Sequence, residues 1–325
     1  MHFYTRYNLL ISCRLQWLCM IVLIVLILSC TGQKRQKSVY YWQTTLHLDN
    51  AERNFLQKHD IDKVYCRYFD VVLNSDGQPV PNATLQFEDS FPEGVEIVPV
   101  VYILNDCFKH PADNLAEQTF NRIMKMSEVN NVRNVSGVQI DCDWTLSTQQ
   151  NYYAFMTVLQ SLCHSHNLQL SSTVRLHQLS QTPPPADYGV LMVYNTGDVT
   201  KKSVEKPILD IKDVKPYMRY LKNYRLKLSA AYPFFSWKVL FRGDKYVGIM
   251  HSDDDLPVLP GDNIVIRQPE MEDIGQAQKA INAARKDVND EIILYDLSDR
   301  NIRRFASGYI ERIYNNNIDD KAIYE

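Results

Sequence analysis

The feature that most constrains the fold is a repeated alternation between β-favouring and helix-favouring segments along most of the chain. Short runs rich in valine, isoleucine and tyrosine are followed by longer segments whose apolar residues recur at helical spacing. This alternation is typical of a parallel sheet with its helices outside. We expect strands at 39–44, 63–72, 94–104, 138–143, 168–176, 189–194, 226–232 and 291–297.

Eight such strands predict an α/β fold, a (β/α)8 barrel of the TIM type, over a single domain at 39–325. We expect helices at 49–59, 112–129, 148–166, 214–220, 274–288 and 301–314, with Asp49 as the N-cap of the first. The alternatives are two small domains or a doubly wound open sheet. No GxGxxG motif follows the first strand, which excludes the commonest nucleotide-binding version of the open sheet.

One segment departs from the alternation and predicts an insertion after the seventh strand. Residues 237–241 and 246–250 are β-favouring runs on either side of a turn at 242–244, which indicates a β-hairpin. An acidic, proline-containing loop is expected to follow, as far as Asp262. Loops after the strands carry function in barrels, so the hairpin is expected on the functional face.

The N-terminal segment is predicted to be a targeting sequence. Two arginines precede an uninterrupted apolar run at 17–28. That run fits a secretory signal and is shorter than the roughly 20 residues of a membrane span, although a single anchoring helix is the alternative. Ser29-Cys30 at its end resembles a bacterial lipobox, with Ile27 where leucine is usual. The resemblance implies a signal peptide at 1–29, a lipid on Cys30, a polar tether at 30–38, and an exported protein anchored in the cell envelope.

Composition excludes several classes of protein. The formal net charge is −3 and the basic residues are scattered, which argues against a nucleic-acid partner. The cysteines of the predicted domain form no CxxC pair, so no structural zinc site is expected. We expect buried free thiols, while an oxidising compartment would also permit disulfides. No metal or cofactor is expected. The cysteines concerned are Cys66, Cys107, Cys142 and Cys163.

The fourth predicted strand carries the clearest chemical signal. Its side chains alternate, so Gln139, Asp141 and Asp143 share one face and apolar residues share the other. The polar face is expected to point into the barrel, with both aspartates near the mouth where barrel enzymes place catalytic groups. Two carboxylates about 6.6 Å apart along a strand repel, so one can keep its proton, as glycosidic cleavage requires. The alternative is a structural pair that caps a helix or binds an arginine.

These residues resemble the fourth-strand signature of chitinase-like family 18 glycosidases, D-G-x-D-x-D-x-E. Aligned on Gly137, Asp143 takes the place of the family's acid glutamate and Asp141 that of the aspartate that orients the substrate's N-acetyl group. Gln139 and Ser136 replace two further aspartates. The resemblance implies a glycoside hydrolase acting on a glycan that contains N-acetylglucosamine.

Two later segments agree with the same resemblance. Tyr194-Asn195 resembles the family's sixth-strand M-x-Y-D, whose tyrosine and aspartate bind the N-acetyl group, and the segment 231–237 resembles its seventh strand. Asn195 keeps a hydrogen-bonding amide but not the charge. The whole chain also resembles uncharacterised lipoproteins of Bacteroides-type bacteria.

Further candidates come from the fifth strand and the tryptophans. Arg175 and His177 are expected to point inward near the mouth. Arg175 is expected to pair with Asp141 or Asp143. His177 is either a functional residue or a hydrogen-bonded structural one. Trp42, Trp144 and Trp237 all fall at or just past strand ends, which predicts a platform on which sugar rings stack.

Two functions follow. The first is a hydrolase with Asp143 as acid and Asp141 as its partner. Its expected substrate-binding residues are Gln139, Arg175, His177, Tyr194, Asn195, Trp42, Trp144 and Trp237. The second is a non-catalytic glycan-binding envelope lipoprotein on a degenerate barrel, favoured by the missing glutamate. Asp70 or Asp296 is the alternative source of the missing carboxylate.

Overall fold

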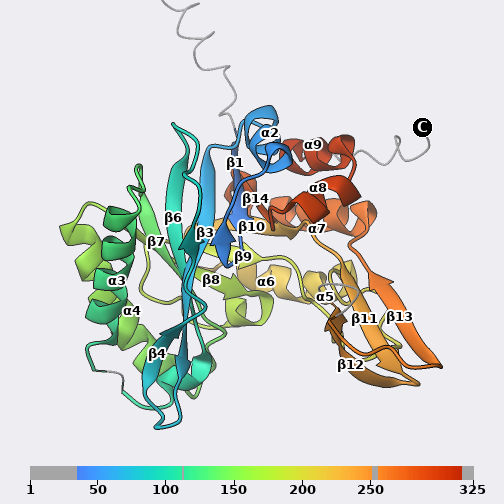
Figure 1. Ribbon diagram of the computed structural model, residues 1–325, viewed down its shortest axis with the longest axis horizontal. Helices are drawn as coiled ribbons and strands as arrows, with labels where there is room; N and C mark the ends of the chain where they lie inside the picture. The colour runs from blue at the N-terminus through green and yellow to red at the C-terminus, as the bar shows by residue number, and fades with distance from the viewer. Residues whose placement is uncertain (1–34, 112, 251–254, 317–325) are drawn as a thin grey trace, which may run out of the picture. The chain divides into compact units, whose positions relative to one another are not determined.

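The structure, a computed structural model, describes residues 35–111, 113–250 and 255–316. Eight parallel strands form a closed barrel, because β1 pairs with both β3 and β14. This confirms the predicted (β/α)8 architecture (Figure 1). In barrel order the strands are β1 (Gln36–Tyr41), β3 (Lys63–Leu73), β6 (Glu96–Ile103), β7 (Gly137–Asp141), β8 (Gln169–Arg175), β9 (Tyr188–Met192), β10 (Leu228–Pro233) and β14 (Glu291–Tyr295).

Side-chain alternation divides each strand between the barrel interior and the helical layer. On β7, Val138 and Ile140 belong to the large core between strands and helices, whereas Gln139 points inward and accepts a hydrogen bond from Tyr40 of β1, 2.6 Å away. A second buried cluster, with Tyr40, Tyr65 and Ile293 among its members, fills the interior. The interior is therefore a packed core, and ligands have access only at its ends.

The helices lie where the alternation predicts them, but three of the six are divided. The predicted helix at 274–288 is α7 (Met271–Ala284) followed by the 3-10 turn η4 (Lys286–Asn289). The predicted helix at 214–220 is a composite of α5 (Ile211–Val214), the 3-10 turn η3 (Lys215–Tyr217) and α6 (Met218–Leu221). The predicted last helix is two, α8 (Asp299–Arg304) and α9 (Ser307–Asn315), because the backbone is extended at Phe305 and Ala306. The other helices are α2 (Asn50–Lys58), α3 (Leu115–Val129) and α4 (Gln149–Ser165), and the other 3-10 turns are η1 (Asn105–Phe108) and η2 (Leu176–Ser180).

The predicted N-cap of the first helix is present. The Asp49 side chain accepts a hydrogen bond from the Glu52 amide, and the Glu52 side chain accepts one from the Asp49 amide. This capping box satisfies two backbone donors that the helix cannot satisfy itself. It also fixes both carboxyl groups beside the end of β1.

The barrel begins earlier than the sequence predicts. Residues 36–38, assigned above to the tether, form the start of β1 and pair with β14. A ladder of backbone hydrogen bonds needs no apolar side chains, and the Ser38 hydroxyl donates to the buried Glu291 carboxylate at 2.6 Å. The polar composition of this segment therefore does not mark it as a tether.

The insertion after the seventh strand is a small antiparallel sheet. The predicted hairpin is β11 (Trp237–Arg242) and β12 (Lys245–Met250), and a third strand that was not predicted, β13 (Asp262–Arg267), pairs with the other edge of β11. Figure 1 shows this sheet projecting from the barrel beside α5. The remaining strands are β4 (Pro79–Asn82), antiparallel to β3, and the short pair β2 (Thr45–Leu46) and β5 (Gln86–Phe87).

The predicted signal peptide and its Cys30 lie outside the described residues. Within the described ranges, no helix is both long and apolar enough to cross a bilayer. The four cysteines of the barrel are free thiols and are buried.

Candidate functional site

Strand β7 positions the two predicted carboxylates differently. Asp141 is its last residue and points inward, so its side chain is only 8% exposed. Asp143 lies past the end of the strand, and its side chain is 54% exposed. Alternation predicts that both aspartates lie on one face of the strand, but only Asp141 lies within the strand.

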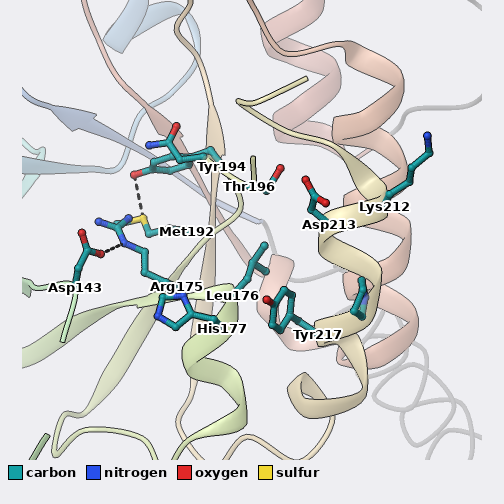
Figure 2. Close-up of a pocket in the computed structure, with 12 residues that line it drawn as sticks. Asp143, Arg175, Leu176, His177, Met192, Tyr194, Thr196, Lys212, Asp213 and Tyr217 are labelled. Atoms are coloured by element: carbon teal, nitrogen blue, oxygen red, sulfur yellow. Dashed lines mark hydrogen bonds and ion pairs between the residues drawn. The ribbon is translucent and has the colours of Figure 1, made fainter. Parts of the chain in front are cut away.

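Arg175 joins both carboxylates. It is the last residue of β8, the neighbour of β7, and its Nη2 atom donates to Asp141 Oδ1 at 3.2 Å while its Nε atom donates to Asp143 Oδ1. The Thr173 hydroxyl donates to the same Asp141 oxygen at 2.7 Å. Figure 2 shows the Arg175 guanidinium directed at Asp143. The predicted pairing of Arg175 therefore involves both aspartates at once.

The electrostatics follow from this arrangement. Burial raises the pKa of Asp141, while the Arg175 charge and the Thr173 hydrogen bond act in the opposite direction. Burial alone would lower the pKa of Arg175, but the carboxylates of Asp141 and Asp143 raise it above its ordinary value. Arg175 is thus a permanently charged group held between two acidic side chains.

A cavity of about 540 Å³ opens beside this bridge, and we call it the bridge pocket. Six of the predicted site residues come together there or beneath it, since Asp141 lies under the bridge and five others line the wall (Figure 2). The predicted residues that line it are Asp143, Arg175, His177, Tyr194 and Asn195, and its other walls include Met192, Thr196, Lys212, Asp213 and Tyr217.

Tyr194 and Asn195 follow the end of β9. Tyr194 is buried, and its hydroxyl lies 3.1 Å from the Met192 sulfur. Asn195 is exposed and has φ 54°, a left-handed conformation that asparagine tolerates better than most residues. The backbone therefore turns sharply at Asn195 and leaves its amide at the surface of the pocket.

His177 lies on the pocket wall for a different reason from the predicted one. Strand β8 ends at Arg175, and His177 belongs to the 3-10 turn η2, so strand alternation no longer determines its direction. It is exposed to solvent. It therefore reaches the pocket from a turn and not as a continuation of the strand.

A second cavity, of about 670 Å³, lies on the side of β1, β10 and β14, and we call it the aromatic pocket. Trp42 and Trp237 line it together with Tyr295, as do the polar side chains of Asp296 and Asn301. Asn195 lines both pockets. The Tyr194 and Tyr295 rings stack with their centroids 4.9 Å apart, so this aromatic pair connects the wall of the bridge pocket with that of the aromatic pocket.

Two predicted binding residues do not reach either pocket. Trp144 is 1% exposed and stacks on Tyr152 of α4, so the predicted platform of three tryptophans keeps only Trp42 and Trp237. Trp144 follows β7 into the helical layer, where strand alternation no longer applies. Gln139 is fully buried inside the barrel, between Tyr40 and Ser171. Its distance from the mouth follows from its position two residues before Asp141.

The two alternative carboxylates have different surroundings. Asp70 is held by Arg67, whose Nε atom donates to it at 2.8 Å. Asp296 follows β14 and accepts a hydrogen bond from Asn301 at 2.9 Å. Burial raises the pKa of Asp296 to about 7. Asp296 can therefore carry a proton near neutral pH.

Several residues of the site were not predicted. Tyr295 shares the inward face of β14 with Glu291 and Ile293, so alternation along that strand would have identified it. Thr173 shares the inward face of β8 with Arg175, so alternation along that strand would also have identified it. Lys212, Asp213 and Tyr217 come from the short helical turns after β9, and no local pattern places them near β7.

Comparison with known proteins agrees with the fold. No protein-family model matches the sequence, and neither does any curated protein. Among solved structures, a chitinase from Chromobacterium violaceum superposes with a TM-score of 0.59 at 12% identity, covering 88% of this chain and 99% of that one.

Two further structures are similar. The spore cortex-lytic enzyme SleL from Bacillus megaterium has a TM-score of 0.53 at 11% identity, over 82% of this chain and 72% of that one. The GH18 chitinase ChiB from Flavobacterium johnsoniae has a TM-score of 0.51 at 13% identity, over 88% and 94%. At these identities the likeness concerns the fold alone, and the chain has the barrel of GH18 chitinases and SleL-like enzymes.

Proposed function

We propose that this protein binds a carbohydrate chain containing N-acetylglucosamine at the mouth of its barrel, without cleaving it. The observation that carries the proposal is the Arg175 guanidinium, which donates to both Asp141 and Asp143. The glycosidase-like barrel supports the class of ligand, because the similar structures are chitinases and a cortex-lytic enzyme.

The bridge opposes acid catalysis by Asp143. A general acid must carry a proton on the oxygen that faces the leaving group. Hydrogen bonds from a guanidinium stabilise the charged form of a carboxylate, and here they engage both members of the pair. Asp143 is also one methylene shorter than the glutamate at the corresponding position of the family 18 glycosidase signature. The same polar groups remain well suited to bind sugar hydroxyls.

Hydrolysis and binding assays on the full-length protein test this proposal. We expect no cleavage of β-1,4-linked N-acetylglucosamine oligomers at any pH, and binding that Asp143→Asn weakens only modestly. Asp76→Asn, an exposed turn residue, is the control. Cleavage by wild type that disappears in Asp143→Asn would overturn the proposal and identify the acid.

A glycoside hydrolase is the second candidate. It is supported by the exposure of Asp143 into the bridge pocket, where a substrate that displaced Arg175 would meet a free carboxyl group. Asp143 would then be the acid and Asp141 its partner. Arg175→Gln is the diagnostic variant, because it would raise the rate of such an enzyme by releasing Asp143.

We also propose that the protein is exported and held at the cell envelope by a lipid on Cys30. The support for this location is the sequence at 17–30 alone.

A further inference from the structure

The aromatic pocket has the composition of a site for an uncharged sugar ring. Trp42 packs against Tyr295 with centroids 5.5 Å apart, and Phe235 joins Tyr295 to Trp237 at 5.9 Å and 5.1 Å. Aromatic faces pack against the C–H face of a pyranose, while the ring hydroxyls need directed polar groups. Asp296, Asn301 and Asn195 supply such groups in the same cavity.

Asp296 is the polar group with the most constrained surroundings. Asn301 donates both to its carboxylate and to its backbone carbonyl, each at 2.9 Å, which fixes the side chain against α8. No lysine, arginine or histidine forms an ion pair with it in the part of the chain that the structure describes. In this respect it differs from Asp141 and Asp143, which share Arg175.

The charged groups around Asp296 come from two helices and one loop. Asp49 and Glu52 lie at the start of α2, Asp299 and Arg300 belong to α8, and His47 lies on the loop before α2. Arg300 favours the charged form of Asp296, and Glu52 opposes it. Burial also raises the pKa of Glu52. A ligand that covers this pocket removes water from carboxyl groups. Few positively charged side chains lie near these groups to stabilise their charged form.

We propose that the aromatic pocket holds a third, uncharged sugar unit of the same glycan, and that its binding brings a proton from solvent onto Asp296. The inference rests on the proposed function, since the first two units occupy the bridge pocket. Asn195 and the stacked rings of Tyr194 and Tyr295 connect the two positions. The carboxyl oxygen of Asp296 that Asn301 does not engage then carries the proton and donates it to a sugar hydroxyl, so that Asp296 is not left as an unpaired buried charge.

Calorimetry on the full-length protein in detergent tests the inference, with a disaccharide and a pentasaccharide of β-1,4-linked N-acetylglucosamine as probes. We expect the pentasaccharide to bind more tightly, and Trp237→Ala to remove that advantage while disaccharide binding stays unchanged. The advantage should decrease above pH 7, by up to about tenfold per pH unit for one linked proton. Titration in two buffers of different ionisation enthalpy should show proton uptake with the pentasaccharide only.

Asp296→Asn should make the pentasaccharide advantage independent of pH and abolish the proton uptake. Asp299→Asn is the matched control, because Asp299 is a neighbouring carboxylate that Arg303 already engages at 2.7 Å. Equal affinity for the two probes, or proton uptake that persists in Asp296→Asn, would overturn the inference and leave the proposed function standing. Binding of neither probe would overturn both.

Discussion

The Nη2 atom of Arg175 lies 3.2 Å from Oδ1 of Asp141, so the last residue of β8 is tied to the last residue of β7 inside the barrel mouth. The pair is largely removed from water, so removal of either partner would leave the other as a buried charge without compensation. Together with the contact between Arg175 and Asp143, it places one positive and two negative side chains at the mouth of the barrel.

Replacing Arg175 should therefore destabilise the protein. We expect Arg175→Gln to lower the free energy of unfolding by about 3 kcal/mol, because it leaves the buried Asp141 without its cation. Urea denaturation measures this loss. Arg303→Gln removes an exposed ion pair with Asp299 and should cost less than about 1 kcal/mol. Equal effects of the two variants would show that the Arg175 bridge is energetically no different from a surface pair.

Asp296 predicts a pH dependence of stability. Its pKa is about 7 in the folded protein against an ordinary value of 3.8, so between these values the folded state binds more protons than the unfolded chain. Its contribution to stability is present below pH 4 and is lost as the pH rises through 7, by up to about 1.4 kcal/mol per pH unit. Asp296→Asn removes this contribution to the slope.

Urea denaturation of wild type and Asp296→Asn between pH 5 and pH 8 measures the difference. The variant should gain stability relative to wild type as the pH rises, whereas Asp76→Asn, at an exposed turn, should follow wild type throughout. Parallel curves for wild type and Asp296→Asn would show that Asp296 is already charged at pH 5.

Sequence pattern predicts those features that depend on strand period. The inward direction of Asp141 and Arg175 follows from alternation along β7 and β8, and the same argument applied to β14 identifies Tyr295. The period ends with the strand, so it determines neither the position of Trp144, which is buried, nor that of His177, which lies on a turn. Where a strand stops depends on its neighbours rather than on its own residues.

Other features depend on contacts between distant segments. The turns after β9 reach the bridge pocket through Lys212 and Asp213, and the separation of Trp42 from Asp143 into two cavities depends on how the loops pack. The sequence before strand β13 is acidic and indicates no structure locally, and the strand is defined by its pairing with β11. Such long-range arrangements leave no periodic pattern in the sequence.

The proposed lipid anchor predicts a change in location on mutation. Cys30→Ala removes the only sulfur at the lipobox-like site, so the protein should lose palmitate labelling and fail to mature or leave the membrane fraction. Cys107→Ala, at a buried thiol of the barrel, is the control and should keep both properties. Labelling and fractionation of Cys30→Ala like those of wild type would exclude the anchor.

Gly137 offers a test of how closely the site depends on the register of β7. A Cβ atom at Gly137 would lie 2.6 Å from the backbone oxygen of Gln169, its partner on β8, and neither backbone can move without shifting the strand pair. We expect Gly137→Ala to destabilise the protein by about 1–3 kcal/mol. Because Asp141 and Arg175 lie on these same two strands, glycan affinity should fall as well. Gly308→Ala, on α9 with open space around it, should be neutral or stabilise by about 0.5 kcal/mol and leave affinity unchanged. If Gly137→Ala lost stability but bound glycan as wild type does, the geometry of the bridge would not depend on this contact, and the ligand would be held by residues outside β7 and β8.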